Sequence, residues 1–403
     1  MSNIFESFLS TSEVQEAFGA RNVLDAMLRF EAALARAQAG VGLIPQAAAQ
    51  SIIGTCKVDL FDVPKIVRES ARASCIAIPL LNSLKETVSL FNKEAAAFVN
   101  FGSTNQDVID TALALVTRNA IKLIEADVDK TVAALLTLAS RHADDPLLAR
   151  TLMQPASVTS FGLKCADWAA PLLRSRLRLQ SSASNALCVQ LGGAVGTLAQ
   201  MQDKGAQVMT LMATDLQLKA PLFSWHTQRD EWVAMGCELG LLVGSLGKVA
   251  KDITLMAQFE VGELTESLGT GGGDAKEMLH RRHQVACMVA LAAAQRAPQR
   301  VAALLAAMPQ EHERALANRQ VELAEWPGLL MSAHGAARAM AQALVGLQVD
   351  PQRMRANLDT FRAVLPPKEA SQWFNPGLAQ QAADLARTRL NVLVALRQPT
   401  ETA

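Results

Sequence analysis

The sequence predicts an all-α protein built around a bundle of long helices. Half of the 403 residues are hydrophobic but 4% are aromatic, and Ala and Leu, which favour helices, supply much of the apolar content. Long stretches such as 106–140 have helical apolar spacing with hardly a breaker. Long helices with short connections imply an elongated bundle. Their apolar surface exceeds what one bundle buries, which predicts a homo-oligomer.

Composition and charge exclude several classes of partner. The formal net charge is +0, so nothing points to nucleic acid or an anionic membrane surface. The N-terminus lacks the basic and apolar regions of a signal peptide, and no apolar run is long and uninterrupted enough to span a bilayer. The six cysteines include no CxxC pair, so metal-ligand spacing is absent. We expect a cytoplasmic protein without a metal, nucleic-acid or membrane partner.

Helical signals follow one another through the first hundred residues. Apolar spacing predicts one helix over 12–39, with Gly40 just past its end, and a short helix over 46–53. Pro64 and Pro79 stand at positions suited to the first turns of two further helices.

The first polar break, residues 100–106, is too small and polar for a buried helix interior. Thr104 or Asn105 is predicted to cap a helix that begins near Gln106, with Asp107 favourable in its first turn. This break is either a capped helix start and nothing more, or a place where exposed amides and hydroxyls bind a carboxylate.

A second polar break at 149–168 contains Gln154 and Thr159. The helices predicted after it are 163–186, a long helix from 221–232 to 264, 278–306 and 310–345. Three glycines in 191–199 indicate close backbone approach. The C-terminal segment starts at 349–359, turns at 366–368 and 374–377, and ends in a helix over 378–397.

The third break lies within 260–287. A glycine-rich run, 269–273, precedes a cluster of cations and imidazoles, namely Lys276, His280, Arg281, Arg282 and His283. Flexible backbone followed by positive charge suggests a mobile loop that closes over an anion, with a solvated connector as the alternative. Because no strand precedes the glycines, they do not form a dinucleotide-binding motif, and the two histidines have no third metal ligand nearby.

Three further histidines carry weaker signals. His226, beside Arg229 and Asp230, is predicted to belong to a polar helix start. His312 and His334 are predicted to lie on solvated helix surfaces.

The breaks and their flanking motifs, taken in order, resemble the fumarase/aspartase superfamily. The motifs include GSTNQDVIDTALAL, RTLMQPASVTSFGLKCADW, WHTQRD, AEWPGLL and VDPQRMRANLD. The resemblance implies a three-domain fumarase/aspartase-like fold with a central long-helix bundle, divided here as 1–99, 100–345 and a shortened C-terminal domain, 346–403. It also implies a homotetramer in which three subunits build each active site, and proton transfer next to a carboxylate without metal or organic cofactor. In the cycloisomerase branch, which belongs to aromatic catabolism, a carboxylate adds across a double bond to close a muconolactone.

The resemblance carries over residue by residue in part. Thr104, Gln106 and Asp107 match the family's first motif, whereas Asn105 replaces a Ser and Asn100 a His. In the second motif Gln154 and Thr159 match, and Pro155 stands in place of a His. In the loop His280 and Arg282 match; Ala275 takes the place of the family's proposed base, a Ser, Arg281 that of a Lys and His283 that of an Asn.

These observations predict an enzyme, a cycloisomerase or carbon–heteroatom lyase with altered chemistry that acts on a small, 3-carboxymuconate-like carboxylate. The candidate catalytic residues are Lys276, His280 and His283. The candidate substrate-binding residues are Thr104, Asn105, Gln106, Gln154, Thr159, Arg281 and Arg282. The alternative is a catalytically degenerate paralogue that serves as a binding, structural or partner subunit.

Overall fold

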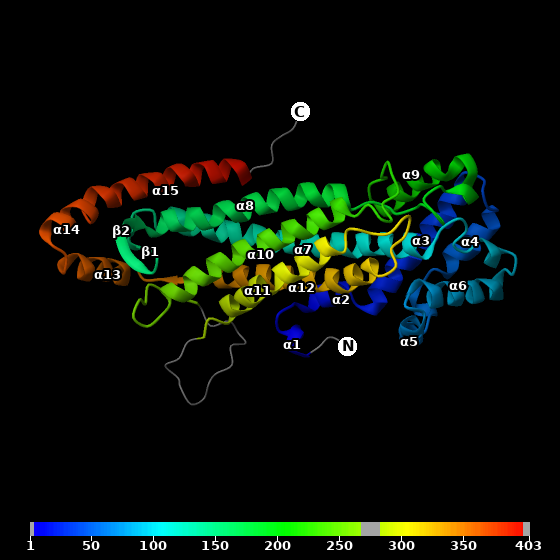
Figure 1. Cartoon of the computed structure of the whole chain (residues 1–403), viewed down its shortest axis with the longest axis horizontal. Coiled ribbons are helices and arrows are strands. Elements are labelled where there is room, and N and C mark those ends of the chain that lie inside the picture. Colours follow the sequence, from blue (N-terminus) through cyan, green and yellow to red (C-terminus); the bar gives the residue numbers. More distant parts are fainter. Residues whose placement is uncertain (1–3, 267–282, 398–403) are drawn as a thin grey trace.

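Long helices that run side by side along the molecule form its centre (Figure 1). The computed structural model describes residues 4–266 and 283–397. The central helices are α7 (Asn105–Arg141), α8 (Phe161–Ala186), α10 (Asp230–Met256), α11 (Val285–Ala306) and α12 (Asn318–Val345). Helix α7 packs on α8 and α12, and α10 packs on α8, α11 and α12. The all-α prediction is confirmed.

A second group of helices gathers at one end of this bundle, around the start of α7 (Figure 1). They are α3 (Ala20–Gly40), α4 (Gln46–Thr55), α5 (Val63–Ala73), α6 (Ala77–Phe91) and α9 (Gly205–Leu216). Single 3-10 turns lie at Val58–Leu60, Ala95–Phe98 and Ala199–Lys204. The N-terminal helices α1 (Ile4–Ser7) and α2 (Ser12–Ala17) precede α3, and α2 contacts α7 and α12.

The other end of the bundle carries a β-hairpin and the C-terminal helices (Figure 1). Strands β1 (Pro146–Thr151) and β2 (Gln154–Ser160) pair antiparallel, and so do β3 (Leu264–Thr265) and β4 (Gln348–Val349). The C-terminal helices are α13 (Pro351–Ala363), α14 (Pro367–Trp373) and α15 (Pro376–Arg397). Helix α13 contacts β1, and α15 packs on β2 and α8.

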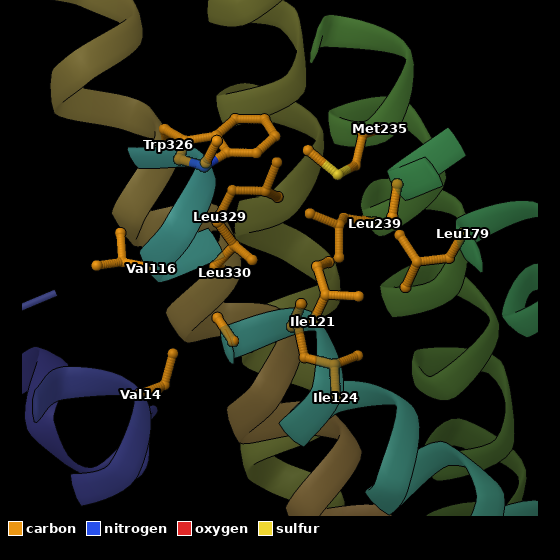
Figure 2. Close-up of a cluster of buried hydrophobic side chains, with 14 of the residues drawn as sticks. Val14, Val116, Ile121, Ile124, Leu179, Met235, Leu239, Trp326, Leu329 and Leu330 are labelled. Atoms are coloured by element: carbon orange, nitrogen blue, oxygen red, sulfur yellow. The ribbon is translucent and has the colours of Figure 1, made fainter. Parts of the chain in front are cut away.

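The core is an aliphatic layer between the long helices. Figure 2 shows Ile121 and Ile124 of α7 facing Leu239 of α10 and Leu329 of α12, all fully buried. Trp326 of α12 stacks near Trp232 of α10, with ring centroids 4.3 Å apart. Buried aliphatic side chains contribute roughly 1.5–3 kcal/mol each, so this layer holds the helix ends, and the side chains on them, at fixed separations.

Local sequence signals set several helix starts as predicted. Thr104 is the N-cap of α7, and the Asp107 carboxylate accepts a hydrogen bond from its backbone N–H at 3.1 Å. Asp62 caps α5, whose first turn contains Pro64. Such caps satisfy backbone N–H groups that have no partner within the helix.

Other element boundaries differ from the prediction. The single helix over 12–39 is wrong, because the backbone at Gly19 is extended and separates α2 from α3. The polar break at 149–168 coincides with most of the β1–β2 hairpin, which begins at Pro146, and with the first turns of α8. The long helix expected from 221–232 begins later, at Asp230, and ends at Met256 rather than at 264. The predicted helix 310–345 begins at Asn318, and the turn at 366–368 is the start of α14.

Helix α10 alone, within the residues described, is long and apolar enough to cross a membrane by length and composition. The apolar pattern of the sequence predicted no such helix. Slightly more than half of its most apolar window, 56%, is buried inside the protein against the neighbouring helices. A core helix of a soluble protein passes the same test.

Candidate active site

A cleft of about 490 Å³ lies beside the N-terminus of α7. Asn105 and Gln106 of the first break line it, together with Arg314 and Arg319 from the segment that precedes and begins α12. Ser74 and other residues of the α5–α6 connection form the opposite wall. The end of a long helix, with its partial positive charge, here meets two guanidinium groups, an arrangement that favours an anion.

Arg314 brings a positive charge that its neighbours do not neutralise. Its guanidinium donates to the hydroxyl of Thr104 at 2.7 Å and to the carbonyl oxygens of Gly193 at 2.7 Å and Ala194 at 2.9 Å. These acceptors are neutral, and within the described residues no carboxylate lies within ion-pair distance of Arg314. Thr104, predicted to bind substrate, therefore positions a cation of the cleft.

Arg319 has one donor left over. Its Nη1 donates to Asp110 at 2.6 Å, whereas its Nη2 is buried without a hydrogen-bond partner. A buried donor without a partner is unfavourable by about 1–3 kcal/mol. Arg319 lines the cleft, so its positive charge faces a carboxylate bound there, and a small movement that uncovers Nη2 would let the carboxylate accept from it.

A buried ionic network on the side away from the cleft fixes the position of Arg319. Arg229 donates to Glu322 at 2.9 Å through Nε and to Asp110 at 3.3 Å, and its guanidinium lies 4.5 Å from the ring of Trp225. Burial opposes the ionisation of Asp110, but Arg319 and Arg229 outweigh burial and lower its pKa. Two carboxylates thus share two guanidiniums, which sets the orientation of Arg319.

Asp107 joins three segments at the start of α7. Its buried carboxylate accepts from the backbone N–H groups of Gly192 at 3.1 Å and Gly193 at 3.0 Å, and it lies 2.6 Å from Nε2 of His226. Gly193 has φ +68°, a conformation that favours glycine. A Cβ at Gly193 would lie 2.8 Å from the backbone oxygen of Gly102, which confirms the predicted close backbone approach at this glycine. His226 has a structural contact to a buried carboxylate.

The second break lies at the far end of α7. Gln154 is exposed at the start of β2, and Thr159, half-buried, pairs with Leu147 of β1. The hairpin is held by Arg150, which forms two hydrogen bonds of 2.9 and 3.0 Å with the buried Glu263 just before β3.

The residues on either side of the third break come together at the end of the bundle that carries the β-hairpin. Glu266 accepts from the backbone N–H groups of Ala286 at 2.9 Å and Cys287 at 3.3 Å, and so caps α11. His283 is exposed two residues before that helix. Lys276, His280, Arg281 and Arg282, together with Ala275 and the glycine run, lie outside the described residues.

A single chain separates the candidate site residues into two groups. Helix α7 has 37 residues and is about 55 Å long at 1.5 Å per residue. Thr104, Asn105 and Gln106 lie at its start, whereas Gln154 and Thr159 follow its end (Figure 1). One small molecule cannot touch both groups of one chain.

Arg314 and Arg319 were not among the predicted site residues. The apolar pattern predicted one helix over 310–345, yet residues 310–317 are a polar connection with several charges and no helical structure. That run of charges between two apolar helices was a signal of a fourth break.

The surface placement of His334 was wrong. His334 is fully buried, with Nε2 3.2 Å from Asp127 and Nδ1 2.7 Å from the hydroxyl of Thr11. Burial and the neighbouring Arg338 lower its pKa. His312 is exposed as predicted, but it lies in the connection before α12 rather than in a helix.

A larger hollow of about 740 Å³ lies next to the start of α10. Its lining includes Lys219, Phe223 and Ser224, and none of the predicted site residues. The cleft beside α7 is therefore the hollow that combines predicted residues with cations.

Known proteins resemble this chain over most of its length. The model of a lyase family matches residues 8–273. The 3-carboxy-cis,cis-muconate cycloisomerase of Bradyrhizobium diazoefficiens is 40% identical over 91% of this chain and 81% of its own. The cycloisomerase of the same name from Pseudomonas putida is 40% identical over 90% and 86%. A solved structure of 3-carboxy-cis,cis-muconate lactonizing enzyme from Pseudomonas putida superposes with a TM-score of 0.85 at 36% identity, covering 98% of this chain and 91% of that one.

The match to the lyase family covers part of the cleft and of the buried network, and it ends before Arg314, Arg319 and Glu322. The matched residues include α7, α8 and α10 and the segments that place Thr104, Asp107 and His226. The chain is an enzyme, and it belongs to the lyase family within the fumarase/aspartase superfamily.

Proposed function

We propose that this protein is a cycloisomerase, or a closely related carbon–heteroatom lyase, that acts on a small polycarboxylate similar to 3-carboxymuconate. The observation that carries the proposal is the pair Arg314 and Arg319 beside Asn105 and Gln106 in one cleft. The two similar cycloisomerases support this substrate class.

The proposed chemistry begins with recognition of negative charge. Arg314 and Arg319 bind carboxylates, and the amide of Asn105 orients them. Gln106 is proposed to hold this end of the cleft in place, because its amide N–H groups donate to Asp110 at 3.2 Å and to the carbonyl oxygen of His226 at 2.8 Å. In the cycloisomerisation, one carboxylate oxygen bonds to an alkene carbon and a general acid of the site delivers a proton to the neighbouring carbon, so the lactone is an isomer of the substrate with that carboxyl group protonated. The cations stabilise the negative charge that develops next to the bound carboxylate.

Lys276, His280 and His283 are proposed to move the proton, with Arg281 and Arg282 binding the anion and altered chemistry because Ala275 replaces a Ser. A lysine or histidine with a pKa near neutral suits this role. Gln154 and Thr159 are proposed to approach the substrate from another copy of the chain.

An assembly of several copies, proposed to be a tetramer, brings the separated groups into one site. The tip of the β1–β2 hairpin supports this proposal, because Leu152 and Met153 are 97% and 71% exposed. Apolar side chains at an exposed tip gain by burial against another chain.

The test is an assay of purified protein with 3-carboxy-cis,cis-muconate, in which loss of the diene absorbance is followed in the ultraviolet. Arg314→Gln removes the charge but keeps an amide donor for the nearby carbonyls. We expect kcat/KM to fall about 10- to 100-fold, the effect of losing one charged hydrogen bond. Arg389→Gln, an exposed arginine paired with Asp167, is the matched control and should keep full activity.

A panel of succinyl adducts distinguishes the two activities. Release of fumarate from an adduct would indicate a lyase, whereas loss of the diene absorbance of 3-carboxy-cis,cis-muconate alone would indicate a cycloisomerase. A rate on neither substrate class would support the degenerate paralogue, which binds without turnover.

A further inference from the structure

Glu31 of α3 holds the segment that leads into α7. Its side chain is 1% exposed, and Oε2 accepts a hydrogen bond from the backbone N–H of Asn100 at 3.0 Å. Gln38, two turns along the same helix face, donates to the carbonyl oxygen of Phe101 at 2.6 Å. Helix α3 therefore fixes two consecutive residues of the first break.

The segment needs such support because its backbone is strained. Asn100 has φ +57°, in the left-handed region that side-chain-bearing residues rarely adopt. Gly102 follows with φ +70°, and a Cβ there would lie 3.0 Å from Met201. This reversal aims the chain at Thr104, so the contacts of Asn100 decide where α7 begins. A conformation of this kind persists when the surrounding structure over-determines it.

The surroundings of Glu31 favour its uncharged form. Oε1 of Glu31 is buried without a hydrogen-bond partner, and the side-chain oxygens of Gln38 and Asn100 are also unpaired. Burial raises the pKa of Glu31 to about 8, against the bond from Asn100 and the charge of Lys85 on α6. On the other side lies Cys56 at the end of α4, whose own pKa is raised by burial and by Glu31. An ionised carboxylate here would lack the donors that a buried charge requires.

We propose that Glu31 is a positioning residue whose bond to the Asn100 backbone sets the shape of the carboxylate-binding cleft. Loss of that bond frees the strained segment, and with it the placement of Asn105 and Gln106. Ionisation of Glu31 above pH 8 keeps the bond to the Asn100 N–H but leaves charge on the unpaired Oε1, so water enters the α3–α7 contact and the added charge repels an anion. The binding readout rests on the proposed function, whereas the backbone readout does not.

The first arm of the experiment measures amide hydrogen exchange in the peptide that spans 98–104 at pH 7. Glu31→Leu keeps the volume but removes the acceptor, so exchange should become about tenfold faster, the value of one hydrogen bond. Glu31→Gln supplies a carbonyl oxygen in the same place and should retain the protection. Glu86→Gln, an exposed change on α6, is the control. Equal exchange in Glu31→Leu and the wild-type protein would overturn the proposal.

The second arm measures binding of propane-1,2,3-tricarboxylate by calorimetry between pH 6 and pH 9. The wild-type protein should lose about tenfold in affinity as pH rises through 8, and Glu31→Gln should lose less because it cannot ionise. The same alkaline loss in both proteins would contradict a role for Glu31. If the wild-type protein binds the probe at no pH, the proposed function fails, while the exchange arm still decides the role of Glu31.

Discussion

Asp107 and His226, 119 positions apart, form a buried contact of 2.6 Å between the carboxylate and Nε2. The contact ties the first turn of α7 to the segment before α10. The same carboxylate accepts from the backbone of Thr104 and of two glycines. One side chain therefore fixes the start of α7, and with it the position of Asn105 and Gln106 in the cleft.

Asp107→Asn should destabilise the protein by about 2–4 kcal/mol, because an amide has one acceptor oxygen and turns a donor toward other donors. Unfolding in urea, followed by circular dichroism, measures the change. The control is Asp167→Asn, an exposed partner of Arg389, which should shift stability by less than about 0.5 kcal/mol. Equal changes in the free energy of unfolding for the two variants would show that the buried hydrogen bonds of Asp107 do not stabilise the fold.

Arg319→Lys should lower kcat/KM by about tenfold while the protein stays folded, because lysine keeps the charge near Asp110 but lacks the second donor of the guanidinium fork. Steady-state kinetics, together with the melting temperature of the variant, separate the two effects. Arg389→Lys is the matched control. An unchanged kcat/KM would mean that the free Nη2 does not meet the substrate.

Arg314→Gln and Gln154→Ala should complement each other when they are co-expressed. The two residues belong to opposite ends of α7, so a site that uses both must draw them from different chains. A mixed assembly then contains some sites with both residues intact. The measurement compares kcat/KM of the co-purified mixture with that of the two variants purified apart and combined at the same concentration. No gain in the co-expressed protein would mean that each site is built by one chain.

His334→Gln should reduce the loss of stability between pH 7.5 and pH 5. Burial and Arg338 lower the pKa of His334 in the folded protein, so the unfolded chain takes up this proton at higher pH than the folded one. Stability from the neutral ring is complete above the ordinary histidine pKa near 6.5 and is lost as pH falls through the folded value. Melting temperatures of both proteins at the two pH values give the difference. His312→Gln, at an exposed position, should change nothing.

Local signals in the sequence were sufficient for several helix starts. Thr104 caps α7 and Pro64 stands in the first turn of α5, and both roles depend on residues within three or four positions. The local sequence was therefore enough to predict them. The delayed start of α10 could not be read this way. His226 and Arg229 are held by Asp107, Asp110 and Glu322, which lie about a hundred positions distant.

The candidate site was predictable in part for the same reason. The first break was recognised from its own composition, and its residues line the cleft. Arg314 and Arg319 were hidden because the apolar spacing after residue 318 was extended backwards over a polar connection. The first and second breaks lie far apart because α7 is long. The uninterrupted helical pattern over 106–140 already predicted that length.

The hairpin tip also bears on attempts to make this protein more heat-resistant. Leu152 and Met153 both have positive φ, the geometry of a two-residue turn that Asn-Gly adopts without strain. Replacing the pair with Asn-Gly should raise the melting temperature of the separated chain, because it removes strain of about 1–3 kcal/mol for each residue, but it also removes the apolar side chains that are proposed to pack against another copy. The tip is thus less stable than its turn geometry allows. Because it is proposed to contact another copy of the chain, the Asn-Gly replacement suits uses that do not require turnover.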